Sequence, residues 1–162
     1  MDSYSKYVDK LKKEVTDFLF SLVSIKSYPN DEMVACDYAY QKFSEIDGVK
    51  VEKIMMDNDF KNHPFWCYGF MDDTDYTGHY NIEVTWPGTG QEKAFFMNAH
   101  IDTVPAMSEG LLPPRMDDDI IYGLGACDDK GSVASIYTVF KLLSKFNVEL
   151  PFDVIGHIVV EE

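Results

Sequence analysis

The feature that most constrains the fold is an uncharged apolar run, residues 94–99, that ends in His100 and Asp102. A run of this kind, which includes Phe95 and Phe96, predicts a strand buried on both faces, as in parallel sheets covered by helices. Ligands of open α/β sheets bind beyond the carboxyl ends of the strands, so His100 and Asp102 are expected at an active-site rim. Because residues i and i+2 share one face of a strand, Asp102 can orient one nitrogen of His100 while the other nitrogen faces a metal.

Two further segments bring acids to the ends of predicted elements. Residues 123–131 open a predicted helix with Asp128 and Asp129, and residues 152–160 form a second apolar strand followed by Glu161 and Glu162. Histidine, aspartate and glutamate are nitrogen and oxygen ligands that zinc accepts. Each motif alone also has a simpler interpretation, since a histidine at a strand end can be structural and acids at a helix start can be caps that favour its dipole.

Taken together, residues 98–105, residues 123–131 and the final glutamate pair resemble the M20 family of amidohydrolases and exopeptidases in both order and spacing. This family includes acetylornithine deacetylase, succinyl-diaminopimelate desuccinylase, carboxypeptidase G and aminoacylase. The resemblance implies two divalent metal ions, with zinc expected and cobalt as the alternative. It further implies the following roles: His100 binds one metal, Asp102 orients it, Asp128 bridges both metals, Glu161 is the general base, and Glu162 binds the second metal.

The resemblance also implies a domain organisation. Residues 1–162 correspond to the N-terminal part of a catalytic domain, whereas family members continue more than twice as far, with a further acidic ligand, a late histidine ligand and a lid domain used for substrate recognition and dimerisation. Leu124 replaces the usual arginine, and Val160 replaces a usual polar residue. We therefore expect the isolated chain to bind metal weakly and to be nearly inactive, and the parent protein to be a homodimer.

Hydrophobic periodicity predicts an α/β fold with a mixed, largely parallel sheet flanked by helices. The resemblance implies that this fold is that of a zinc-exopeptidase catalytic domain in truncated form. Turn residues at 87–90 predict a hairpin, and alternating residues at 80–86 predict a strand near the sheet edge. Helices are expected at 4–23, from Asn30 or Asp31 onwards, and from Lys130 onwards, and Lys130 is interpreted as structural. Strands are expected at 49–56, 65–71, 80–86, 94–99, 120–122 and 152–160.

Composition restricts the function classes. With 14 basic and 28 acidic residues, the net charge of −14 argues against a nucleic acid or an anionic membrane surface as partner. There is no apolar run of about 20 residues and no signal-peptide pattern at the start. Three cysteines without a CxxC pair fit a reducing compartment, so the cytoplasm is the expected location.

The expected substrate is a small N-acyl amino acid or a short peptide, cleaved at an amide by water activated between two metal ions. Two alternatives stay open. One is a dinuclear aminopeptidase or dipeptidase, and the other is a non-catalytic α/β interaction module in which the acids are only caps and solvated turns.

Overall fold

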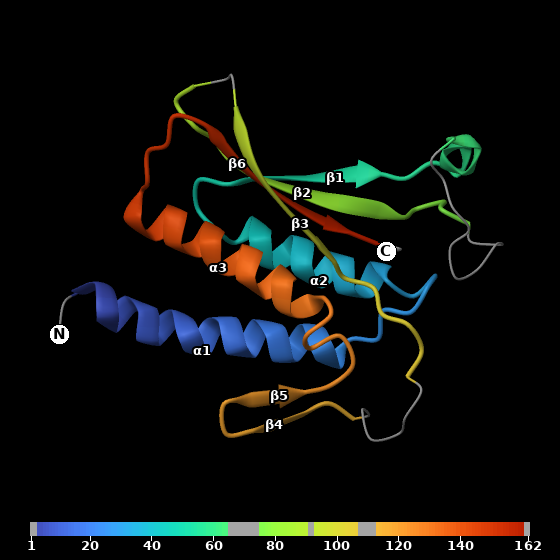
Figure 1. Cartoon of the computed structure of the whole chain (residues 1–162), viewed down its shortest axis with the longest axis horizontal. Helices are drawn as coiled ribbons and strands as arrows, with labels where there is room; N and C mark the ends of the chain where they lie inside the picture. The colour runs from blue at the N-terminus through green and yellow to red at the C-terminus, as the bar shows by residue number, and fades with distance from the viewer. Residues whose placement is uncertain (1–2, 65–74, 91–92, 107–112, 161–162) are drawn as a thin grey trace.

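The computed structural model describes residues 3–64, 75–90, 93–106 and 113–160, and these residues form an α/β domain. The described strands form a four-stranded sheet and a two-stranded one, and Figure 1 shows the helices α1, α2 and α3 on one side of the larger sheet. The expected α/β class with a mixed sheet flanked by helices is confirmed, but the expectation that the sheet is largely parallel is wrong for the described strands: β1–β2 and β2–β6 are antiparallel, and β3–β6 is parallel. The strand expected at 65–71 lies outside the described residues.

The three helices are α1 (Ser3–Ser24), α2 (Met33–Ser44) and α3 (Lys130–Phe146), close to the predicted bounds. Helices α2 and α3 pack on the sheet, and α1 packs on α3. The residue at the N-cap of α2 is Glu32 and not Asn30 or Asp31, and its side chain makes no capping hydrogen bond. Asn30 instead has a φ of 72° and lies in the turn before the helix.

The sheet has the order β1 (Lys50–Met55), β2 (Tyr80–Trp86), β6 (Asp153–Val159) and β3 (Ala94–His100). Strand β6 pairs in parallel with β3 and antiparallel with β2, and β1 pairs antiparallel with β2. Because β6 lies between β2 and β3, residues 87–90 do not form the predicted hairpin. Strand β6 pairs with β2 at the position where the predicted hairpin would have placed β3.

The predicted burial of β3 on both faces is wrong for this chain. Phe95 and Phe96 are each 55% exposed, and among the described strands β3 lies at the sheet edge. Strand β2, which was expected nearer the edge, lies inside the sheet and buries its alternate residues from Tyr80 to Trp86. The apolar sequence of β3 thus marks a strand that could be covered, but the described residues provide no cover for its outer face.

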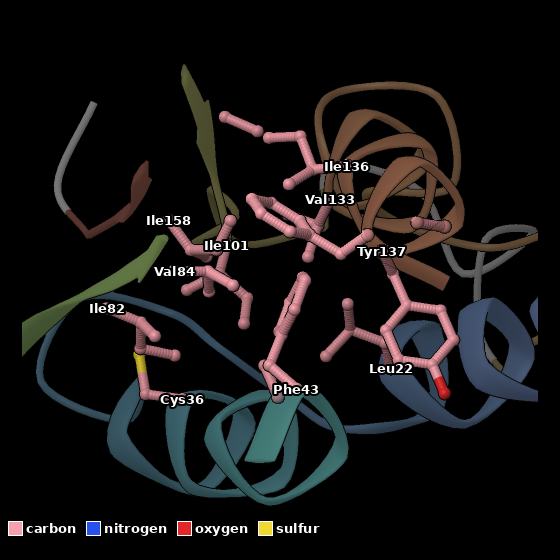
Figure 2. Close-up of a cluster of buried hydrophobic side chains, with 14 of the residues drawn as sticks. Leu22, Cys36, Phe43, Ile82, Val84, Ile101, Val133, Ile136, Tyr137 and Ile158 are labelled. Atoms are coloured by element: carbon pink, nitrogen blue, oxygen red, sulfur yellow. The ribbon is translucent and has the colours of Figure 1, made fainter. Parts of the chain in front are cut away.

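The hydrophobic core lies between the sheet and the helices, as Figure 2 shows. Phe43 of α2 and Tyr137 of α3 meet edge to face, with ring centroids 5.4 Å apart. Gly156 of β6 allows α3 to approach closely, because a Cβ atom there would lie 2.7 Å from Ile136 Cγ2. The labelled side chains of the core are Leu22, Cys36, Phe43, Ile82, Val84, Ile101, Val133, Ile136, Tyr137 and Ile158.

Two small elements complete the described structure. Strands β4 (Arg115–Asp117) and β5 (Ile120–Tyr122) form a hairpin whose turn includes Asp118, with a φ of 50°. This confirms the predicted strand at 120–122. A 3-10 helix covers Asn58–Asn62. None of the helices described is both long and apolar enough to cross a membrane.

Candidate metal centre

His100 and Asp128 meet at the carboxyl end of β3. His100 is the last residue of that strand, and Asp128 lies in the loop before α3. The Nε2 atom of His100 lies 3.0 Å from Oδ1 of Asp128. The His100 side chain is 13% exposed and that of Asp128 is 90% exposed. The pair therefore joins a largely buried imidazole to a carboxylate that solvent can reach.

Asp102 lies on the other side of the same imidazole ring. Its Oδ1 atom is 3.5 Å from Nδ1 of His100. The segment around Asp102 is held by Ser27, which follows α1: the Ser27 hydroxyl donates to the carbonyl of Ile101 at 2.9 Å, and the Thr103 amide donates to the carbonyl of Ser27 at 2.8 Å. The two nitrogens of His100 therefore face two carboxylates from different segments. The orienting role of Asp102 stays a prediction.

The loop that carries Asp128 packs closely against the loop that follows His100. Gly125 has a φ of +79°, and a Cβ atom at that position would lie 2.7 Å from Thr103 Cγ2. Glycine is the residue that tolerates both this backbone conformation and this close approach. Gly125 thus allows residues 123–129 to bring Asp128 to His100.

Lys130 anchors the start of α3 from below. Its side chain is 1% exposed, and Nζ donates to the carbonyls of Leu22 and Ile25 at 3.0 and 2.8 Å. These carbonyls lie at the end of α1, where backbone acceptors lack partners within the helix. The interpretation of Lys130 as structural is confirmed, and its position two residues after Asp128 couples the end of α1 to the site.

Burial and the neighbouring carboxylates set the electrostatics beneath the site. Burial lowers the pKa of Lys130 to about 8, while the negative charge of Asp102 acts in the opposite direction. Burial, followed by the charges of Glu32, Asp37 and Asp102, raises the pKa of Cys36 to about 12. The Cys36 thiol is therefore protonated at neutral pH and is unsuited to act as a nucleophile.

The paired glutamates Glu161 and Glu162 lie outside the described residues, but the strand that leads to them does not. Val159 of β6 is in register with His100, and its carbonyl accepts from the Ile101 amide at 2.9 Å. In the sequence, Glu161 thus comes two residues after Val159, whose carbonyl is hydrogen-bonded to the segment that carries His100.

The interpretation of the two aspartates as helix caps is not supported by the described geometry. Asp129 is the N-cap residue of α3 and makes no side-chain capping hydrogen bond. Asp128 directs its carboxylate at His100. The described geometry thus shows no capping hydrogen bond from Asp129, and it places the Asp128 carboxylate at His100.

His100 and Asp128 fit a divalent metal ion in chemistry and in spacing. Two donors bound to one zinc ion at about 2.0–2.1 Å in tetrahedral geometry lie roughly 3.3 Å apart. The observed separation of 3.0 Å between nitrogen and oxygen is close to this value. No group of three potential ligands occurs within the described residues, so a complete ligand set would need a donor from beyond them.

Comparison with known proteins agrees with this arrangement. Residues 96–162 match the model of peptidase family M20/M25/M40. The chain is 28% identical over 148 residues to the uncharacterized protein YqjE of Bacillus subtilis, covering 85% of this chain and 33% of that protein. It is 34% identical over 89 residues to N-formyl-4-amino-5-aminomethyl-2-methylpyrimidine deformylase of Halalkalibacterium halodurans, covering 51% and 21%.

Among solved structures, the M20 family metallo-carboxypeptidase Sso-CP2 of Sulfolobus solfataricus has a TM-score of 0.64 at 17% identity, over 90% of this chain and 30% of that one. This likeness shows that the two chains share a fold. The match to the M20/M25/M40 family model over residues 96–162 agrees with the resemblance drawn from the motifs. It spans a third or less of the length of the relatives named here.

Sequence analysis missed two residues that position this edge of the sheet, Ser27 and Asn81. Ser27 binds the segment between His100 and Asp102, and Asn81 of β2 binds the backbone of Val160. Both bonds join residues more than 70 positions apart in the sequence. Such long-range contacts leave no periodic pattern, so no signal in one sequence could have identified them.

Proposed function

We propose that this chain is the metal-binding N-terminal part of an M20-type hydrolase that cleaves an amide bond with water activated between two divalent metal ions. The proposal rests chiefly on one observation, the placement of His100 between Asp102 and Asp128. Two separate segments, residues 100–102 and residues 123–129, supply these groups. A third segment, β6, pairs with the His100 strand and precedes the glutamate pair in the sequence. A module with only caps and solvated turns does not require such a convergence.

Each site residue has a proposed role. His100 would bind one metal ion through Nε2, and Asp102 would favour the tautomer in which Nε2 carries no proton. Asp128 would bridge the two ions, and Glu162 would bind the second. When bound, the ions would polarise the amide carbonyl and lower the pKa of water.

Glu161 is the proposed general base. A carboxylate within hydrogen-bond reach of the attacking water takes its proton and later gives that proton to the leaving nitrogen. Two adjacent residues of an extended strand point to opposite faces. Strand β6 ends at Val159, before the glutamate pair, and the proposal requires that the alternation of β6 does not extend to Glu161 and Glu162.

The proposed substrates are small N-acyl amino acids or short peptides, and zinc is the proposed metal, with cobalt as the alternative. The deformylase relative removes a formyl group, and the structural relative is a carboxypeptidase, so both acyl and peptide amides stay candidates. A dinuclear aminopeptidase or dipeptidase is the second candidate within the same chemistry. We propose a cytoplasmic location, since Cys36 and Cys127 are free thiols.

The domain organisation is also a proposal. Residues 1–162 would form the N-terminal part of the catalytic domain of a homodimeric parent, whose remaining ligands and lid domain lie elsewhere in a longer polypeptide. With His100, Asp128 and Glu162 as its main ligands, this chain alone would bind metal weakly and hydrolyse substrates very slowly.

Thermal unfolding with and without metal tests the proposal. A ligand at 100 times its dissociation constant stabilises the folded state by about 2.7 kcal/mol. For a domain of this size, that corresponds to a rise of roughly 5–10 °C in the thermal midpoint. We expect zinc or cobalt to raise the midpoint of the wild type and a chelator to reverse the rise.

Two variants sharpen the test. His100→Ala should abolish the rise, whereas His63→Ala, at an exposed histidine after the 3-10 helix, should retain it. An unchanged wild-type midpoint at millimolar zinc and cobalt would contradict the proposed metal site and favour a non-catalytic module.

A further inference from the structure

The backbone pairing of β6 with β2 ends before β6 reaches the glutamate pair. The last paired residues are Ile82 and Ile158, whereas the pairing of β6 with β3 continues as far as Val159 and His100. Val160 therefore lies beyond the ladder on the β2 side. Its amide still has an acceptor, and that acceptor is a side chain.

The Oδ1 atom of Asn81 accepts the hydrogen bond from the Val160 amide at 3.1 Å. Asn81 belongs to β2, where its backbone is in register with Ile54 of β1. A side chain of an inner strand thus replaces the missing rung of the ladder at the point where β6 leaves β2. Without this acceptor, the partly buried Val160 amide would lose its hydrogen bond, which is unfavourable for a buried donor.

The end of β6 is consequently fixed from both neighbouring strands. The Val159 carbonyl accepts from Ile101 of the His100 segment, and the Val160 amide donates to Asn81. The Val160 side chain is 5% exposed and belongs to the core. The backbone that immediately precedes Glu161 therefore has little freedom.

We propose that Asn81 is a positioning residue for the pair Glu161 and Glu162, an inference that rests on the proposed function. It holds the backbone of Val160, the residue before the pair, and would thereby limit the positions that the two carboxylates can reach. The side-chain carbonyl of an asparagine suits this place because it accepts a hydrogen bond from a backbone amide.

Two variants remove the acceptor, Asn81→Ala and Asn81→Leu, the second of nearly the same shape. Asn81→Asp keeps an oxygen acceptor at the same place. Thr85→Ala is the matched control, since Thr85 lies on the same strand and, four residues on, on the same sheet face, opposite Ile155 of β6.

Two measurements separate positioning from general stability. Hydrogen exchange reports the protection of the Val160 amide, and a cobalt titration followed by visible absorption reports affinity and coordination. We expect Asn81→Ala and Asn81→Leu to lose Val160 protection and to weaken cobalt binding about tenfold or more, the range typical of residues that orient metal ligands. Asn81→Asp and Thr85→Ala should retain protection, and neither should bind cobalt more weakly than the wild type.

The outcomes distinguish the two proposals. If the wild type gives no cobalt spectrum, the proposed function and the role of Asn81 both fail. If the wild type binds cobalt and both acceptor-free variants bind it equally well with an unchanged spectrum, the positioning role alone fails. It also fails if Val160 stays protected in those variants, because another group would then hold its amide.

Discussion

His100 and Asp128 lie 28 positions apart in the sequence, yet the Nε2 and Oδ1 atoms of their side chains are 3.0 Å apart. The first ends an edge strand, and the second precedes a helix packed beneath the sheet. The contact shows that the loop of residues 123–129 folds back over the carboxyl end of β3. Any ligand bound by both residues would therefore link the sheet to the start of α3.

The first prediction concerns the charge of Asp128. Asp128→Asn keeps the shape of the side chain but replaces a charged donor with a weaker neutral one, so affinity for zinc or cobalt should fall at least about tenfold. Isothermal titration calorimetry measures this change. Asp118→Asn, in the β4–β5 turn, is the control and should bind like the wild type. Equal affinities of the two variants would contradict a ligand role for Asp128.

The second prediction separates the roles of Glu161 and Glu162. Glu162→Gln should reduce the rise in thermal midpoint caused by zinc, since it removes a proposed ligand. Glu161→Gln should leave that rise nearly unchanged, because a general base does not hold the metal. In a longer polypeptide that hydrolyses N-acyl amino acids, Glu161→Gln should abolish turnover while metal stays bound. The reverse pattern would exchange the two assignments.

The third prediction concerns the loop that delivers Asp128. Gly125→Ala adds a methyl group 2.7 Å from Thr103 at a φ of +79°, so it combines backbone strain with a clash. Gly78→Ala is a matched control, because Gly78 has a φ of +85° with open space around the added atom. Urea denaturation should show a larger loss for Gly125→Ala, by about 1–3 kcal/mol. Equal losses would mean that the loop moves to accommodate the methyl group.

The fourth prediction tests Lys130 as an anchor. Lys130→Met fills similar space but removes the charged donor from the carbonyls of Leu22 and Ile25. The Leu22 carbonyl keeps the hydrogen bond from the Ile25 amide at 3.2 Å, so the main cost, about 1–3 kcal/mol, comes from the Ile25 carbonyl. The free energy of unfolding should fall by at least about 1 kcal/mol. Lys145→Met, at an exposed position of the same helix, should change it by less than about 0.5 kcal/mol. Similar values for both variants would show that water or other donors satisfy the two carbonyls.

The fifth prediction is a pH dependence away from the site. Glu14 of α1 accepts hydrogen bonds from Tyr137 and Lys141 of α3, both at 2.8 Å. Burial alone would raise the pKa of Glu14, but the bonds from Lys141 and Tyr137 outweigh it and hold that pKa below its ordinary value of 4.5. The folded state thus gains stability from this carboxylate above pH 4.5 and loses it as the pH falls through the lowered pKa.

The variant Glu14→Gln should therefore be less stable than the wild type at pH 6–7, by less than about 1 kcal/mol, since Glu14 is partly exposed. The difference should shrink as the pH falls from 4.5 to 3, as followed by urea denaturation at each pH. Glu149→Gln, at an exposed position after α3, serves as the control. A difference that is constant with pH would show that the loss comes from packing and not from charge.

Much of the fold could be predicted because it depends on local patterns. The apolar residues of α1 and α3 recur three and four positions apart, and the alternation from Tyr80 to Trp86 predicts a strand with one buried face. The motifs around His100 and Asp128 were also visible, since each combines a typical residue type with the end of an element. Periodicity and motif spacing are properties of short segments, and one sequence contains them in full.

The order of the strands could not be predicted in the same way. Six uncharged residues before His100 indicated a strand buried on both faces, yet β3 is the edge strand of the described sheet, with Phe95 and Phe96 more than half exposed. The hydrophobicity of a segment indicates that its side chains can be buried, but the strands and helices packed against it determine how much of them is buried. The insertion of β6 between β2 and β3 is such a neighbour effect.

The sequence by itself determined the types of the elements, the chemical nature of the candidate ligands and the resemblance to M20 hydrolases. Tertiary structure alone decided that Asp128 lies against the His100 ring, that Lys130 binds the end of α1, and that Asn81 holds the residue before Glu161. The reason is physical: these contacts join residues 28 to 108 positions apart, and their energies depend on how whole elements pack against one another.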